Sequence, residues 1–74
     1  MKDLGSILKK HDEEGKISDE DIVDAIRLID SILNQLGRYP AYKLFVSDLF
    51  QTQFSYESMA QYRGLDYQKV KSEQ

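Results

Sequence analysis

The chain has 74 residues with no cysteine, one histidine (His11) and a formal net charge of −3. So short a chain forms a single domain, residues 1–74, and buries only about 60% of the surface that its unfolded form exposes. The lack of cysteine excludes disulfides and thiolate zinc sites, and one histidine leaves too few ligands for a histidine-based metal site. We therefore expect no metal and no cofactor, and we expect association, as a homodimer or with a larger protein, to extend the thin core.

The first half of the sequence predicts two helices. Residues 2–11 carry apolar side chains on one face, which is typical of a short amphipathic helix, and a polar turn around Gly15 follows. Ser18 has the character of an N-cap, because the three acids after it suit the positive end of a helix. This second helix has a broad apolar face over residues 22–36, and Gly37 is expected to end it.

The second half predicts shorter helices. Pro40 suits the first position of a helix, and residues 41–54 have apolar side chains at helical spacing. Ser55 is then expected to cap another short helix that Gly64 breaks, and Asp66 to cap a last one. The sequence therefore predicts an all-α fold, a small bundle of four to five short helices with a helix-turn-helix-like C-terminal corner.

Nothing in the sequence predicts a membrane protein or an enzyme. No apolar run approaches the ~20 residues that span a bilayer, and charges surround the short apolar group at the N-terminus, unlike a signal peptide. We expect a cytoplasmic protein without membrane contact. A single imidazole, no cysteine and no glycine-rich phosphate loop leave no recognisable set of catalytic groups.

Residues 10–21 resemble an EF-hand calcium loop. Gly15 falls at the sixth position of that loop, Ile17 at the eighth and Asp21 at the twelfth. The first ligand position is Lys10, however, and a cation there opposes the bound ion. We interpret this stretch as an acidic turn followed by a helix cap.

The C-terminal stretch has the spacing of a helix-turn-helix, the unit that places a helix in a DNA groove. The packing positions of this motif would be Ala60, Gly64, Leu65 and Val70, and the recognition helix would begin at Tyr67. The side chains available for DNA contacts would be Tyr67, Gln68, Lys69 and Lys71. Acids and bases balance between residues 55 and 74, whereas a DNA-binding face needs an excess of bases. A DNA-binding transcriptional regulator that uses residues 55–74 is therefore the alternative hypothesis.

Acidic residues concentrate between positions 12 and 24, where a single lysine accompanies them. Such a patch would steer the protein toward a basic partner surface and repel DNA. The other interpretation is a solvated helix start. The residues concerned are Asp12, Glu13, Glu14, Asp19, Glu20, Asp21 and Asp24.

A second candidate contact lies in the segment Ser47–Phe50. Bacterial proteins that dock on the DNA-polymerase sliding clamp carry a peptide that reads roughly Gln-Leu-(Ser/Asp)-Leu-Phe. Asp48, Leu49 and Phe50 match its last three positions, whereas Val46 and Ser47 replace the first two. The alternative is that Leu49 and Phe50 are ordinary core residues of an amphipathic helix.

In its size, its acidic N-terminal half and this peptide fragment, the chain resembles the small phage-encoded inhibitors of the bacterial DNA sliding clamp, those of the staphylococcal-phage type. The resemblance implies a protein that works in the cytoplasm of the bacterial host by protein–protein contact, with no catalysis. It also implies that an acidic dimer sits in the positively charged channel of the clamp and excludes DNA. A third hypothesis is an assembly protein that only dimerises through its apolar helix faces.

Overall fold

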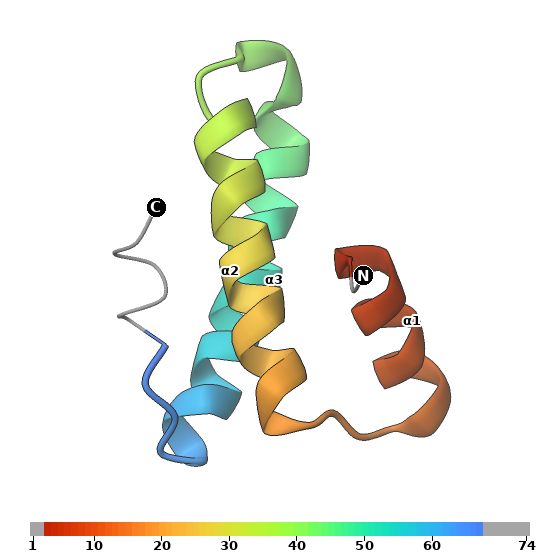
Figure 1. Ribbon diagram of the computed structural model, residues 1–74. Coiled ribbons are helices and arrows are strands. Elements are labelled where there is room, and N and C mark those ends of the chain that lie inside the picture. The colour runs from red at the N-terminus through yellow and green to blue at the C-terminus, as the bar shows by residue number, and fades with distance from the viewer. Residues whose placement is uncertain (1–2, 68–74) are drawn as a thin grey trace.

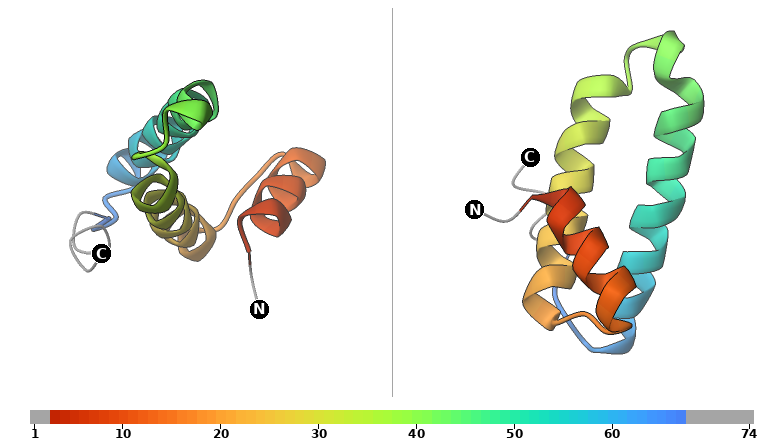
Figure 2. Two further views of the ribbon diagram at one scale, coloured as in Figure 1. Left: turned by 90° about the horizontal axis from the view of Figure 1, so that it is seen from above. Right: turned by 90° about the vertical axis from the view of Figure 1, so that its right-hand side faces the viewer.

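The computed structural model describes residues 3–67, and this part of the chain is all-helical (Figure 1). It contains α1 (Leu4–Glu14), α2 (Asp19–Leu36), the 3-10 turn η1 (Pro40–Tyr42) and α3 (Lys43–Tyr62). Helices α2 and α3 form a long antiparallel hairpin, and α1 lies across the half of the hairpin where α2 begins and α3 ends (Figure 2). The predicted all-α class is confirmed. The number of helices is not, because residues 3–67 form three α-helices and one 3-10 turn instead of four to five helices.

Helix α1 begins at a capping aspartate and ends at a glycine. The Asp3 carboxylate accepts the Ser6 backbone N–H at 2.7 Å, and this hydrogen bond lowers the pKa of Asp3 below its ordinary value. Gly15 has φ +70 and donates its N–H to the His11 carbonyl, which closes the last turn. The helix therefore continues to Glu14, three residues beyond the predicted end. Because residues 10–14 are helical, the stretch that resembles a calcium loop does not form one.

Helix α2 follows the prediction closely. The Ser18 hydroxyl accepts the Asp21 N–H at 3.2 Å, so the predicted N-cap is confirmed. Gly37 does end the helix, although in the right-handed conformation instead of the left-handed one. A glycine is still required there, because a Cβ on Gly37 would lie 2.7 Å from the Leu33 carbonyl oxygen.

Helix α3 is one continuous helix, so the break predicted at Ser55 is wrong. The Ser55 hydroxyl donates to the Gln51 carbonyl one turn earlier, which satisfies it inside the helix instead of at a cap. The buried residues on either side of Ser55 also keep one helical period, which a break would interrupt. These residues are Leu49, Gln53, Tyr56 and Ala60.

The end of α3 explains the spacing that resembles a helix-turn-helix. The Leu65 N–H donates to the Ala60 carbonyl at 2.8 Å, and the Gly64 N–H donates to the Gln61 carbonyl at 3.1 Å. With φ +73 at Gly64, this pair of bonds is a Schellman motif, which terminates a single helix. Tyr67 is not helical, and Val70 lies outside the described residues with the rest of the predicted recognition helix.

Replacing Gly64 with alanine is expected to lower the free energy of unfolding by about 1–2 kcal/mol, because a Cβ is strained at positive φ. Urea unfolding followed by circular dichroism measures this loss. Gly5→Ala is the matched control: Gly5 lies in the first turn of α1 and its added Cβ meets its nearest neighbour only at 3.5 Å. This control should be neutral or stabilising. Equal losses in the two variants would contradict the assigned helix end.

The core lies between α2 and α3 and is closed at one end by α1. Ile22, Ile26 and Ile29 of α2 are fully buried, and Ile7 is the buried residue of α1. Two polar residues are buried, Asp21 and Gln53, and the Gln53 amide, which is only 4% exposed, donates to the Ile26 carbonyl at 3.3 Å. This bond joins the two long helices, and it satisfies a group whose burial would otherwise be costly.

Candidate interaction surfaces

The acidic residues predicted to meet a partner occupy two different helix ends. Asp19, Glu20 and Asp21 fill the first turn of α2, where the helix dipole favours negative charge. Asp12, Glu13 and Glu14 are exposed in the last turn of α1, where the dipole disfavours negative charge. Helix stability therefore accounts for the acids of α2 but not for those of α1. The α1 acids, residues 12–14, are the better candidates for contact with a partner.

Other predicted acids have structural roles. Asp19 accepts a hydrogen bond from Arg63 at 2.8 Å, and the same guanidinium nitrogen donates to the Ile17 carbonyl at 2.8 Å. This contact ties the end of α3 to the start of α2. Asp24 pairs with Arg27 at 3.6 Å, and Asp21 is only 3% exposed. The seven acids therefore do not form one continuous solvent-facing patch.

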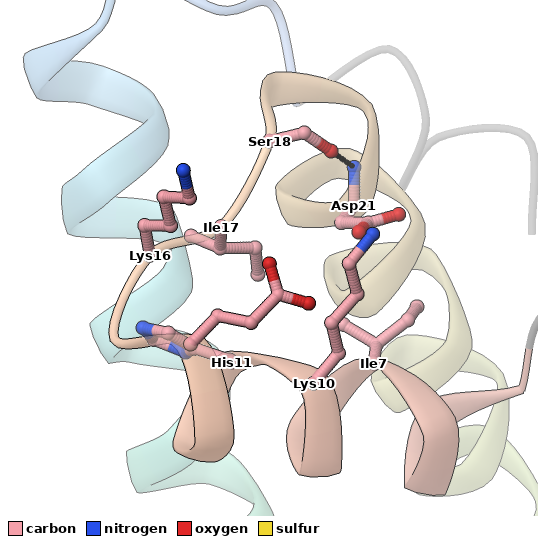
Figure 3. A pocket seen from close by; sticks show the side chains of 8 residues that line it. Ile7, Lys10, His11, Lys16, Ile17, Ser18 and Asp21 are labelled. Atoms are coloured by element: carbon pink, nitrogen blue, oxygen red, sulfur yellow. Dashed lines mark hydrogen bonds between the residues drawn. The ribbon is translucent and has the colours of Figure 1, made fainter.

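A cavity of about 230 Å³ lies between the end of α1, the linker that follows and the start of α2 (Figure 3). Its wall includes two lysines and two carboxylates beside apolar side chains, so no single charge sign dominates it. The volume is below the roughly 300–1,000 Å³ of ligand pockets. We therefore assign it no small-molecule ligand. The lining residues are Ile7, Lys10, His11, Glu14, Lys16, Ile17, Ser18 and Asp21.

His11 connects α1 to α3. Its Nδ1 lies 3.2 Å from the Tyr56 hydroxyl, and the ring centroids are 5.9 Å apart. Tyr56 is 4% exposed, and its burial raises the pKa of the hydroxyl above the ordinary 10.0. The one histidine of the chain therefore takes part in packing. No group of three or more metal-ligating side chains occurs within residues 3–67.

The raised pKa of Tyr56 predicts a loss of stability in alkaline solution. The folded protein holds the hydroxyl proton more tightly than the unfolded chain does. The protonated hydroxyl therefore makes its full contribution to the free energy of unfolding below about pH 10, and this contribution disappears as the pH rises through the folded-state pKa. Urea unfolding between neutral and strongly alkaline pH should show the decline, and Tyr56→Phe should make it shallower. Tyr62→Phe, at a side chain that is 94% exposed, should keep the wild-type profile. If the stability of Tyr56→Phe declined with pH as steeply as that of the wild-type protein, the decline could not come from the Tyr56 hydroxyl.

The clamp-like segment lies in the first half of α3, and its residues do not share one face. Leu49 is 8% exposed and belongs to the core, whereas Phe50 is 56% exposed and Asp48 is also at the surface. While α3 is folded, Phe50 is accessible to a partner and Leu49 is not. Docking of both side chains in one pocket would require α3 to unwind locally.

Phe50 belongs to an aromatic outward face of α3. Ser47, Phe50, Phe54, Ser58 and Gln61 are all exposed and recur at spacings of three and four residues, so they share one side of the helix. We call these five residues the α3 seam. At 3.6 residues per turn, Phe50 and Phe54 lie roughly 100° and 140° around the helix from buried Leu49. The two phenylalanines therefore point away from the core, and Phe54 is 69% exposed.

The exposed surface of α3 is nearly free of charge. Two carboxylates occur between Leu44 and Tyr62: Asp48 is exposed on another side of the helix from the α3 seam, and Glu57 is partly buried at the edge of the seam, one turn from Phe54. An uncharged exposed surface with large apolar side chains marks a binding site, because interface centres are depleted in charged residues. The apolar side chains at helical spacing over residues 41–54 therefore lie on more than one side of α3. The scarcity of charge between residues 44 and 56 was the signal that α3 is apolar on more than one side.

The alternative DNA-binding surface is described only at its beginning. Tyr67 is partly buried and lies outside any helix, whereas Gln68, Lys69 and Lys71 lie outside the described residues. In residues 55–67 the one base is Arg63, which already contacts Asp19.

None of the helices within residues 3–67 combines the length and the apolar character needed to cross a membrane. A comparison of the chain with models of protein families, with curated proteins and with solved structures found no match.

Proposed function

We propose that this protein acts by binding another protein, without catalysis, and that its partner is the bacterial DNA sliding clamp. We base the proposal of protein binding on the α3 seam, an exposed helix face that presents two phenylalanines and has no charged residue among its five members. The choice of the clamp comes from the segment Asp48–Phe50 and from the acidic character of the chain. The expected outcome of binding is that the clamp is blocked from DNA and host replication stops.

The α1 acids supply the electrostatic part of this proposal. A clamp carries positive charge where it encloses DNA, and Asp12, Glu13 and Glu14 are exposed at a place where helix stability does not require them. Opposite charges speed the encounter and set the orientation of the complex more than they add affinity. Binding should therefore weaken as the salt concentration rises.

The α3 seam supports a homodimer as the form that binds. Phe50 and Phe54 expose 56% and 69% of their surface, which corresponds to roughly 100–150 Å² for each ring. Two copies packed through their seams would bury four such rings, about 500 Å² of apolar surface at the centre of an interface of ordinary size, ~1,200–2,000 Å². None of the five seam residues is charged, and the carboxylate at the edge of the seam, Glu57, is partly buried, so the centre of the contact is free of charge repulsion despite the net charge of −3 on each copy.

The test is to mix the purified protein with a purified bacterial clamp and to follow co-elution on a sizing column at low and moderate salt. Asp12→Lys/Glu13→Lys should weaken binding by about tenfold or more, since two attractive contacts become repulsive. Lys9→Glu, in the same helix, changes charge in the opposite direction and should strengthen binding. Independent elution of the wild-type protein and the clamp at low salt would rule out the clamp as partner. A parallel run with duplex DNA tests the DNA-binding alternative.

A further inference from the structure

The hairpin tip differs in character from the rest of the molecule. We define the tip as Arg38, Tyr39, Pro40, Ala41, Tyr42 and Lys43, the segment that connects α2 to α3 at the end of the hairpin opposite the α1–α2 linker (Figure 1). Its backbone is held by internal hydrogen bonds: Tyr39 donates to the Leu36 carbonyl at 3.0 Å, and Tyr42 donates to the Tyr39 carbonyl at 3.0 Å. Pro40 fixes a further backbone angle. The tip is therefore ordered before any partner binds, which lowers the entropy cost of binding.

Two tyrosines dominate the surface of the tip. Tyr39 and Tyr42 are 51% and 48% exposed, and their rings meet edge to face with centroids 6.3 Å apart. This ring pair limits the motion of both side chains while it leaves apolar ring surface and polar groups accessible. Tyrosine and arginine are among the residues enriched where binding energy concentrates in protein interfaces.

The tip is also the basic part of an acidic protein. No aspartate or glutamate occurs from residue 31 to residue 47, and this stretch contains Arg38 and Lys43. Within residues 3–67 no carboxylate forms an ion pair with either of these two bases. Asp48, in the second turn of α3, is the first acid after the tip, and most of the acids gather toward the opposite end of the hairpin, in α1 and the first turns of α2. The two ends therefore differ in both charge and chemistry.

We propose that the hairpin tip binds an acidic segment of a partner protein that also carries apolar side chains. Carboxylates of the segment would pair with Arg38 and Lys43, and its apolar side chains would pack on the rings of Tyr39 and Tyr42. An acidic protein segment suits this surface better than a nucleic acid, because two bases are few for a phosphate backbone.

This inference goes beyond the proposed function and does not depend on it. The tip has the wrong charge for the basic channel of a clamp, so it must face a second surface, on the same partner or on another one. A protein with an acidic end and a basic aromatic tip can bridge two surfaces of opposite charge. Failure of clamp binding would leave the tip hypothesis standing, and failure of tip binding would leave clamp binding through α1 and α3 standing.

The test is an NMR titration of the full-length isotope-labelled protein, a method that detects weak binding and maps it. The probes are a peptide of alternating glutamate and leucine, the same peptide with glutamine in place of glutamate, and a single-stranded oligothymidine. The glutamate peptide should shift the amide signals of residues 37–45, and the glutamine peptide should bind at least about threefold more weakly, as expected for the loss of exposed ion pairs.

Arg38→Glu/Lys43→Glu should abolish the response to the glutamate peptide, and circular dichroism should show that the variant is folded, because both residues lie at the surface. Lys9→Glu/Lys10→Glu makes the same change of charge in α1 and should leave the response unchanged. Tyr39→Ala/Tyr42→Ala should weaken binding although both bases remain. Equal binding of the two peptides, shifts located away from the tip, or stronger binding of oligothymidine would each overturn the proposal.

Discussion

Replacing Leu49 with alanine is expected to lower the free energy of unfolding by about 2–4 kcal/mol, whereas replacing its neighbour Phe50 should lower it by less than about 1 kcal/mol. Leu49 is 8% exposed and packs in the core between α2 and α3, so its truncation leaves a cavity. Phe50 is 56% exposed, and its ring loses few protein contacts on truncation. Because small domains have a total stability of only a few kcal/mol, the first variant should be largely unfolded near body temperature.

Urea unfolding of the two variants, followed by circular dichroism at low protein concentration, measures this difference. Low concentration matters, because association through Phe50 would add to the apparent stability of the wild-type protein. Ser47→Ala is the control for a substitution on the α3 seam that removes no apolar contact, and it should be close to neutral. If Phe50→Ala were as destabilising as Leu49→Ala, the two side chains would share the core and the α3 seam would not exist.

Leu49 and Phe50 also allow a test of how a clamp would bind the clamp-like segment. If a clamp takes up Leu49 and Phe50 together, α3 must unwind, and amide hydrogen exchange around residues 46–52 should become faster in the complex. If Phe50 alone docks from a folded helix, exchange in this segment should become slower, and the dimer must dissociate because its interface would otherwise bury Phe50. The two outcomes separate binding of an unwound peptide from binding of an intact helix face.

Converting the α3 seam to a charged surface is expected to change a dimer into a monomer. Phe50→Glu/Phe54→Glu removes the apolar centre of the proposed interface and places four carboxylates close together across it. The loss of two aromatic side chains at the centre of an interface costs about 2–4 kcal/mol or more for each, which weakens association by several orders of magnitude. Sedimentation velocity at several protein concentrations measures the change.

The chain offers a matched control at the two ends of the same helix. Leu44 and Tyr62 are 83% and 94% exposed, more than the two phenylalanines, and they lie roughly 80–120° around α3 from Phe54 and Phe50. Leu44→Glu/Tyr62→Glu adds the same charge to the same helix and should leave the dimer intact. A wild-type protein that sediments as a monomer at every concentration, or a control that dissociates like the seam variant, would contradict the proposed interface.

A dimer formed through the seam would also change how stability depends on concentration. Association stabilises the folded state by mass action, so the melting temperature should rise with protein concentration in the wild-type protein and not in Phe50→Glu/Phe54→Glu. This readout is independent of the clamp. It distinguishes the assembly of the protein from the identity of its partner.

The sequence alone determined the parts of this protein that depend on neighbouring residues. The Ser18 cap, the acids after it, the apolar face of α2 and the end of that helix at Gly37 follow from contacts within one or two turns. The end of α1 was placed too early, because the left-handed Gly15 terminates the helix one residue before itself and the polar residues 12–14 are compatible with a helix. The break expected at Ser55 was wrong for a related reason, since a serine hydroxyl also bonds back into its own helix.

Only the tertiary structure decided which face of α3 is buried. Periodicity identifies the apolar side chains of a helix, but α3 carries them on more than one side, so its own sequence leaves the choice open. The choice is made by packing against α2: Leu49 belongs to the buried cluster with the isoleucines of α2, the Gln53 amide on the same face donates to the Ile26 carbonyl, and Phe50 is left outside. The structure likewise gave Asp19 a partner in Arg63, 44 residues away along the chain, and left the α1 acids facing solvent. Contacts between distant residues therefore decide which acids and apolar side chains have structural roles and which are available to a partner. No local sequence pattern encodes these contacts.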